Sequence, residues 1–186
     1  MLSLDRRTGV VLLAAGRGER FGGDKLTALF RGRPLWTWAA QAAEAIDFSE
    51  RIIVVKPDDV PGNRPGWTRI ENPLAPRGMG GSIAAGVSAI SFCERVIVML
   101  ADMPCVSSAH LYQLASADGA AYSRYRGNRP GCPAAFPKST FEGLRGLAGD
   151  QGARRLYDEG DLLISPAGEN ELADVDTVRD LAALAR

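Results

Sequence analysis

The 186-residue chain has no apolar run near the roughly 18 residues of a membrane span, and its start, M-L-S-L-D-R-R, has no long apolar core. These absences argue against a membrane protein and against a secretory signal, so we expect a cytoplasmic protein. Lys plus Arg and Asp plus Glu both number 22, which leaves no surplus charge to attract nucleic acid or an anionic membrane. A small-molecule partner is therefore favoured over nucleic acid or a membrane.

Cysteine and histidine are scarce. Cys93, Cys105 and Cys132 lie far apart and form no C-x-x-C pair, which argues against a structural zinc site and a disulfide framework. His110 is the only histidine, with no cysteine nearby, so a surface or capping role is favoured over catalysis. Lysine is also rare, since only Lys25, Lys56 and Lys138 occur. A lysine inside a glycine-rich loop, such as Lys25, is therefore a candidate functional residue.

A chain of this length fits a single domain, residues 1–186, with one sizeable core. Continuous apolar runs at residues 10–13, 51–55 and 95–100 are typical of parallel strands covered on both faces. Residues 33–46 predict a first helix, with Pro34 at its first position. This alternation predicts an α/β fold.

The segment L-L-A-A-G-R-G-E-R-F-G-G-D-K-L, residues 12–26, directly follows the first predicted strand. Small residues let backbone N–H groups approach an anion, and the interleaved cations supply charge, so the segment predicts a phosphate site. A Walker loop is excluded because Asp24 precedes Lys25 and Leu26 replaces the magnesium-binding hydroxyl. Phe21 stands where a dinucleotide fingerprint needs its third glycine, which argues against a nicotinamide dehydrogenase.

A second glycine-rich turn, residues 72–82, leads into helical spacing at residues 83–90. Ser82 is a reasonable N-cap for that helix, and exposed N–H groups there can receive an anion or the edge of a base. An ordinary capped loop explains the same residues equally well.

Three aspartates are candidate metal ligands. Asp102 follows the apolar run 95–100, at the end of a strand where open α/β sheets place ligand-binding groups. It could instead cap a helix, but Ser107 and Ser108 can cap that helix themselves. Asp174 and Asp176 lie on the same side of a predicted short strand, residues 172–176, before a helix capped by Thr177.

Residues 120–126 and 132–136 predict two strands that form one wall of an acceptor pocket. Residues 138–146 predict a short helix. Asp150 is suited to capping a helix that starts at Gly152 and Ala153, and taken alone that structural role is favoured.

The glycine segment resembles the L-A-A-G-x-G-x-R-x-x-x-x-K-L signature of nucleotidyltransferases of the sugar-nucleotide pyrophosphorylase type. Further segments resemble the same family in the same order: N-P-x-x-x-x-G-M-x-x-S, L-A-D-M-P and D-x-D-T-x-x-D-L. The matches span Leu13 to Leu181, and the chain is similar to the molybdenum cofactor (molybdopterin) nucleotidyltransferases, the MobA-like NTP transferases. The resemblance implies a three-layer Rossmann-like nucleotidyltransferase fold, a mostly parallel mixed sheet with helices on both faces. Its donor-nucleotide half is about residues 9–105, and its acceptor half about 106–186.

The resemblance also assigns roles to residues. It implies catalytic roles for Lys25, Arg20 and Asp102, and Mg²⁺ bound by Asp102 and Asp176 with Asp174 in support. It implies acceptor binding by Cys132, Pro133, Asp150 and Arg154, with Cys132 in a place where the family often has histidine. The implied nucleotide-binding residues are Leu13, Ala14, Ala15, Gly16, Arg17, Gly18, Arg20, Lys25, Asn72, Gly78, Met79 and Ser82.

L-A-A-G resembles the cytidylyltransferase branch more than the guanylyltransferase branch, which usually has L-A-G-G. The expected reaction is therefore transfer of CMP from CTP to a phosphate-bearing acceptor such as molybdopterin, with a molybdoenzyme as a transient partner. The alternatives are GTP as donor, another acceptor such as a sugar phosphate or phospholactate, or a non-catalytic chaperone that binds the pterin cofactor.

Overall fold

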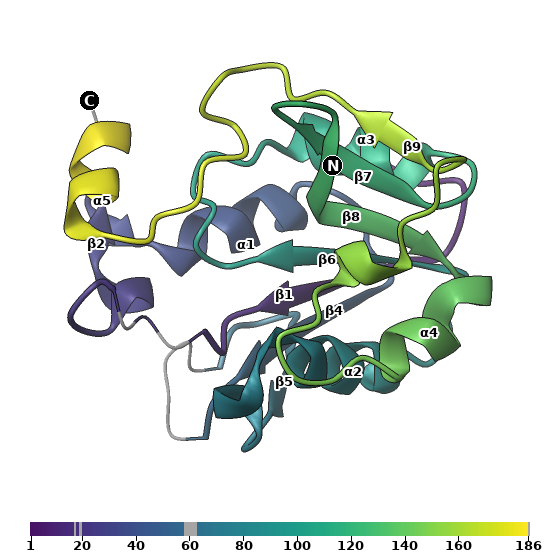
Figure 1. Ribbon diagram of the computed structural model, residues 1–186, viewed down its shortest axis with the longest axis horizontal. Helices are drawn as coiled ribbons and strands as arrows, with labels where there is room; N and C mark the ends of the chain where they lie inside the picture. Colours follow the sequence, from purple (N-terminus) through teal and green to yellow (C-terminus); the bar gives the residue numbers. More distant parts are fainter. Residues whose placement is uncertain (17, 19, 58–62, 186) are drawn as a thin grey trace.

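Figure 1 shows a computed structural model of the chain, which describes residues 1–16, 18, 20–57 and 63–185. The strands are β1 (Thr8–Leu13), β2 (Leu29–Phe30), β3 (Arg33–Pro34), β4 (Glu50–Val55), β5 (Thr68–Glu71), β6 (Arg95–Leu100), β7 (Ala121–Tyr125), β8 (Arg129–Pro137) and β9 (Leu162–Ile164). The α-helices are α1 (Trp36–Glu44), α2 (Met79–Ala89), α3 (Ser108–Ser116), α4 (Phe141–Arg145) and α5 (Val178–Leu184). Short 3-10 helices are η1 (Lys25–Thr27), η2 (Ala75–Arg77), η3 (Lys138–Thr140) and η4 (Ala153–Leu156).

Seven strands form one sheet in the order β5-β4-β1-β6-β8-β7-β9. The first four are mutually parallel, and β8 runs antiparallel to both β6 and β7. The three apolar runs predicted as buried strands are β1, β4 and β6, and they occupy neighbouring positions. Because β1 pairs with β4 on one side and β6 on the other, the ends of these three strands meet at one edge of the sheet.

Alternate side chains of the central strands build a core on each face of the sheet. Val10 and Leu12 pack with α1 and α3, whereas Val11 and Leu13 pack with α2 and α4. The result is the three-layer arrangement visible in Figure 1, with helices on both faces. The predicted fold class is therefore confirmed. None of the helices in the described part of the chain is long and apolar enough to cross a membrane.

Two predictions of helix and strand position are wrong. Pro34 does not begin a helix, because Arg31 and Gly32 have φ angles of 47° and 80° and fold back in a tight turn that pairs Pro34 with Leu29. Residues 172–176 do not form a strand.

The segment 172–176 is held by other contacts. The Val175 N–H donates to the Asp102 carbonyl at 3.0 Å, and the Val175 side chain is buried with Phe30 and Leu35. The predicted cap of α5 is confirmed, since the Thr177 hydroxyl accepts from the Asp180 N–H while the Asp180 carboxylate accepts from Thr177. The segment before α5 is thus tied through Val175 to Asp102, the second residue after β6.

Candidate active site

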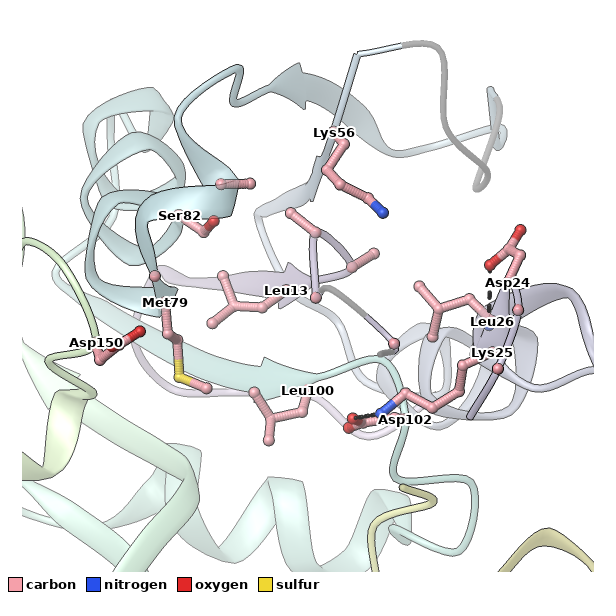
Figure 2. A pocket seen from close by; sticks show the side chains of 18 residues that line it. Leu13, Asp24, Lys25, Leu26, Lys56, Met79, Ser82, Leu100, Asp102 and Asp150 are labelled. Atoms are coloured by element: carbon pink, nitrogen blue, oxygen red, sulfur yellow. Dashed lines mark hydrogen bonds and ion pairs between the residues drawn. The ribbon is translucent and has the colours of Figure 1, made fainter. Parts of the chain in front are cut away.

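A pocket of about 700 Å³ lies at the carboxyl ends of β1, β4 and β6 (Figure 2). This volume is within the usual range for a small-molecule site. Its lining combines apolar groups with a few charged ones: Leu13, Ala14, Ala15, Gly16, Gly18, Gly22, Gly23, Asp24, Lys25, Leu26, Lys56, Ala75, Gly78, Met79, Ser82, Leu100, Asp102 and Asp150. Much of the nucleotide site predicted from the sequence is thus brought together in one cavity.

The glycine segment leaves β1 as an irregular loop with a short 3-10 helix at its end. Gly18 and Gly22 have φ angles of 61° and 78°, which other residues rarely adopt. The Asp24 carboxylate then caps η1 by accepting from the Leu26 N–H at 3.2 Å. This cap holds Lys25 at the first position of η1, beside the end of β6.

Lys25 is the centre of an ion-pair cluster. Its Nζ lies 2.6 Å from Oδ2 of Asp102 and 3.5 Å from Oδ1 of Asp176. The Lys25 and Asp102 side chains are 11% and 21% exposed, so this pair is screened little by water. Arg20 extends the cluster on its solvent side, where its guanidinium donates to Oδ2 of Asp176 at 3.1 Å. Residues 156 positions apart therefore meet at one site.

One carboxylate oxygen of this cluster lacks a hydrogen-bond partner among the described residues. Oδ1 of Asp102 is buried and has no hydrogen-bond partner within the described residues. The pKa of Asp174 is raised by partial desolvation and by the negative charges of Asp102 and Asp176. However, no group of three or more His, Cys, Asp or Glu residues in the described chain is arranged to hold a metal ion. The protein alone thus offers an incomplete cation site.

The other side of the pocket is formed by the start of α2. Gly80 donates its N–H to the Gly149 carbonyl at 2.8 Å, and a Cβ on Gly78 would lie 2.2 Å from the Gly149 backbone. Glycine is needed here because two backbone segments touch. Since this contact sets the start of α2 at Met79, Ser82 lies inside the helix and is not its N-cap, contrary to prediction.

Asn72 supports the pocket from outside. It is buried, its Nδ2 donates to the Ser82 hydroxyl at 3.0 Å, and its Oδ1 accepts from the Leu74 N–H. Among the described residues that line the pocket, Ser82 is included and Asn72 is not. Asn72 therefore reaches the pocket lining through its contact with Ser82, and its role in nucleotide binding stays a prediction.

Of the predicted acceptor residues, only Asp150 lines the pocket. It does not cap η4, whose N-cap is Gly152 without a side-chain hydrogen bond, so the predicted cap is wrong. Arg154 is exposed on η4. Burial, followed by the nearby charge of Asp102, raises the pKa of the Cys132 thiol to about 12. Cys132 precedes a cis bond to Pro133 in β8.

His110 is expected from the sequence at the surface or as a helix cap, but it is buried and the cap of α3 is Ser107. Its side chain has a hydrogen-bond partner in the core. Its Nε2 lies 2.8 Å from the Ser123 hydroxyl, which donates to the Pro133 carbonyl at 2.6 Å. Burial lowers the pKa of His110, which favours the neutral ring. These hydrogen bonds connect α3 through β7 to β8, the strand that contains Cys132 and Pro133.

The structure adds pocket residues to which the sequence motifs do not point. Lys56 directly follows β4 and enters the pocket from a different side than Lys25 (Figure 2). Its position after a buried strand is the available signal, and it is the same signal that identifies Asp102. Arg17 lies outside the described residues. The predicted residues outside the described pocket lining are Arg20, Asn72, Cys132, Pro133, Arg154, Asp174 and Asp176.

The pocket combines a glycine-rich loop, a lysine and aspartates where parallel strands end, which is the edge at which open α/β sheets bind their ligands. The model of the MobA-like NTP transferase domain matches residues 10–163, and the chain belongs to that family of nucleotidyltransferases.

The chain is also similar to individual proteins of known sequence and structure. The purine catabolism protein PucB of Bacillus subtilis is 27% identical, with 90% of each chain covered. The fold is similar to that of Rv0371c from Mycobacterium tuberculosis, with a TM-score of 0.80, 22% identity and coverage of 97% of this chain and 98% of that one. A nucleotidyl transferase from Methanothermobacter has a TM-score of 0.79, 21% identity and 96% of each chain covered.

Proposed function

We propose that this nucleotidyltransferase moves CMP from CTP to a phosphate-bearing acceptor, a molybdopterin-type cofactor, and releases pyrophosphate with a divalent cation, Mg²⁺, at Asp102 and Asp176. The observation that carries the proposal is Lys25, whose ammonium lies between these two aspartates at the mouth of the glycine-lined pocket. The Lys25 ammonium already brings the carboxylates of Asp102 and Asp176 close together. A divalent cation can bind the same two carboxylates, and a triphosphate can bind Lys25.

Nucleotidyl transfer needs charge neutralisation and in-line positioning more than a strong base. An oxygen of the acceptor phosphate forms a bond to the α-phosphorus while the bond from that phosphorus to the bridging oxygen breaks. The electron pair leaves with pyrophosphate. A phosphate monoester is mostly ionised near pH 7, its second pKa being about 6, so no protein group has to deprotonate it.

Lys25 has the main electrostatic role of this chain. When a nucleotide binds, its ammonium can turn from Asp102 to the α-phosphoryl oxygens, where negative charge develops. Backbone N–H groups of the glycine loop, from Gly16 to Gly23, would hold the triphosphate. Arg20 is 80% exposed, and we propose that it shifts from Asp176 to the outer phosphates.

The residues present fit a divalent cation with few protein ligands. Mg²⁺ is commonly held by one or two carboxylates together with substrate phosphates, which agrees with two aspartates and no larger cluster in the described chain. The buried, unpartnered Oδ1 of Asp102 is the best-placed ligand atom. Such a cation supplies charge stabilisation to the transferring phosphoryl group. A structure of Rv0371c in complex with manganese, with a TM-score of 0.71 and 22% identity, supports a cation site in a protein of similar fold.

The donor and the acceptor are tested together. Purified chain is incubated with CTP, GTP, ATP or UTP and with a molybdopterin-type cofactor, a sugar phosphate or phospholactate, and pyrophosphate is measured. CTP with the pterin cofactor should give the highest turnover, and Asp102→Asn should remove it. Binding of the pterin cofactor without turnover of any nucleotide would instead support the chaperone alternative.

A further inference from the structure

Two charged pocket residues have no part in the chemistry above. Lys56 and Asp150 both line the cavity, and Figure 2 shows them entering it from different sides, with Leu13 between them. Lys25 and Asp102 lie at another end of the same cavity. A nucleotide has one strongly charged end and one uncharged end, so the question is which end meets Lys56 and Asp150.

Strand register separates Lys56 from Asp102. Leu13 of β1 is paired with Val54 of β4 and with Leu100 of β6. Lys56 and Asp102 each lie two residues beyond these partners, on strands that flank β1. Two strand spacings correspond to about 10 Å, so the backbone of Lys56 lies roughly this far from the backbone of Asp102, the partner of Lys25.

Asp150 is held in place by backbone contacts. Its loop is fixed to the start of α2 by the Gly80 N–H, which donates to Gly149, and by the close approach of Gly78. A carboxylate held here repels phosphate groups, and the neighbouring lining residues Met79 and Leu13 are apolar. This part of the pocket therefore suits a flat, uncharged base better than a triphosphate.

We propose that Asp150 and Lys56 select the nucleotide base, Asp150 by accepting from an exocyclic amino group and Lys56 by donating to a carbonyl oxygen. An ionised carboxylate only accepts and an ammonium only donates. Cytosine and guanine carry both an amino group and a carbonyl, whereas adenine lacks the carbonyl and uracil lacks the amino group. The inference deepens the proposed function, on which it rests. It places Asp150 at the base of the nucleotide, whereas the resemblance implies that Asp150 binds the molecule that receives the nucleotidyl group.

The test is equilibrium binding of CTP, GTP, ATP and UTP without acceptor, by calorimetry. The wild-type chain should bind CTP and GTP more tightly than ATP and UTP. Asp150→Asn should bring UTP closer to CTP by about 10- to 100-fold, because an amide can also donate to a carbonyl. Lys56→Gln should do the same for ATP, since its amide oxygen can accept from the adenine amino group.

Matched controls are Asp47→Asn and Lys138→Gln, which change exposed residues outside the described pocket lining and should leave the nucleotide profile unchanged. An equal loss of affinity for all four nucleotides in Lys56→Gln would mean that Lys56 binds phosphate, and would overturn its role. An unchanged profile in Asp150→Asn with a raised acceptor KM would restore the acceptor role and overturn this one. Absence of binding of any nucleotide to the wild-type chain would instead refute the proposed function itself.

Discussion

Replacing Lys25 with methionine should lower turnover and, at the same time, tighten binding of a divalent cation to the nucleotide-free protein. The Lys25 ammonium lies 2.6 Å from Asp102, and their side chains are only 11% and 21% exposed. A hydrogen bond between charged groups contributes about 1.5–3 kcal/mol. A cation that binds Asp102 must displace this contact, so its loss should strengthen cation binding by about 10- to 100-fold.

Turnover of the Lys25→Met variant should fall, although its affinity for the cation rises. Without Lys25, charge on the α-phosphoryl oxygens loses one preorganised partner, a loss that typically costs about 10²–10³-fold in turnover. Mn²⁺ binding can be followed by electron paramagnetic resonance without nucleotide, and turnover by pyrophosphate release. Lys138→Met is the matched control and should change neither quantity. An unaltered Mn²⁺ affinity in Lys25→Met would refute the idea that lysine and cation compete for the same carboxylate.

Three further predictions concern single positions. Asp102→Ala should remove nearly all turnover and leave the circular dichroism spectrum unchanged; full activity would eliminate Asp102 as a metal ligand. Gly78→Ala should lower the Tm and weaken nucleotide binding, because its Cβ would lie 2.2 Å from the Gly149 backbone at a φ of 125°; a wild-type Tm would show that the loop can move away. Burial raises the pKa of Cys93 to about 12, so fewer thiolates form at pH 8 than in free cysteine by about 10³-fold. Alkylation of Cys93, followed by mass spectrometry, should therefore be slow at pH 8, accelerate towards pH 12 and become fast on unfolding, whereas rapid modification of Cys93 in the native protein at pH 8 would contradict its burial.

Elements that depend on nearby residues were predictable. The apolar runs of β1, β4 and β6 have no polar alternation, because both faces of these strands are covered by helices. Ser107 caps α3 and Thr177 caps α5, each by accepting a hydrogen bond from the N–H of the third residue beyond it. Such contacts are short in sequence, so the residue pattern alone indicates them.

Errors arose where distant segments decide the local structure. Ser82 has the chemistry of an N-cap, but α2 begins earlier because the glycines at its start pack on residues 148–149. The imidazole of His110 is polar, yet it is buried, because it pairs with Ser123, 13 residues further along the chain. Propensity cannot predict these outcomes, since the competing contacts are made by residues far along the chain.

By itself, the sequence determined the α/β class and the choice of the glycine loop, Lys25 and Asp102 as functional candidates, because each depends on a short contiguous pattern. Only the tertiary structure decided that Lys25 bridges Asp102 and Asp176, that Lys56 and Asp150 enter the same pocket, and that Asn72 supports it from outside. Sheet order and backbone contacts between distant segments bring these groups together, and neither is encoded in the local spacing of residues.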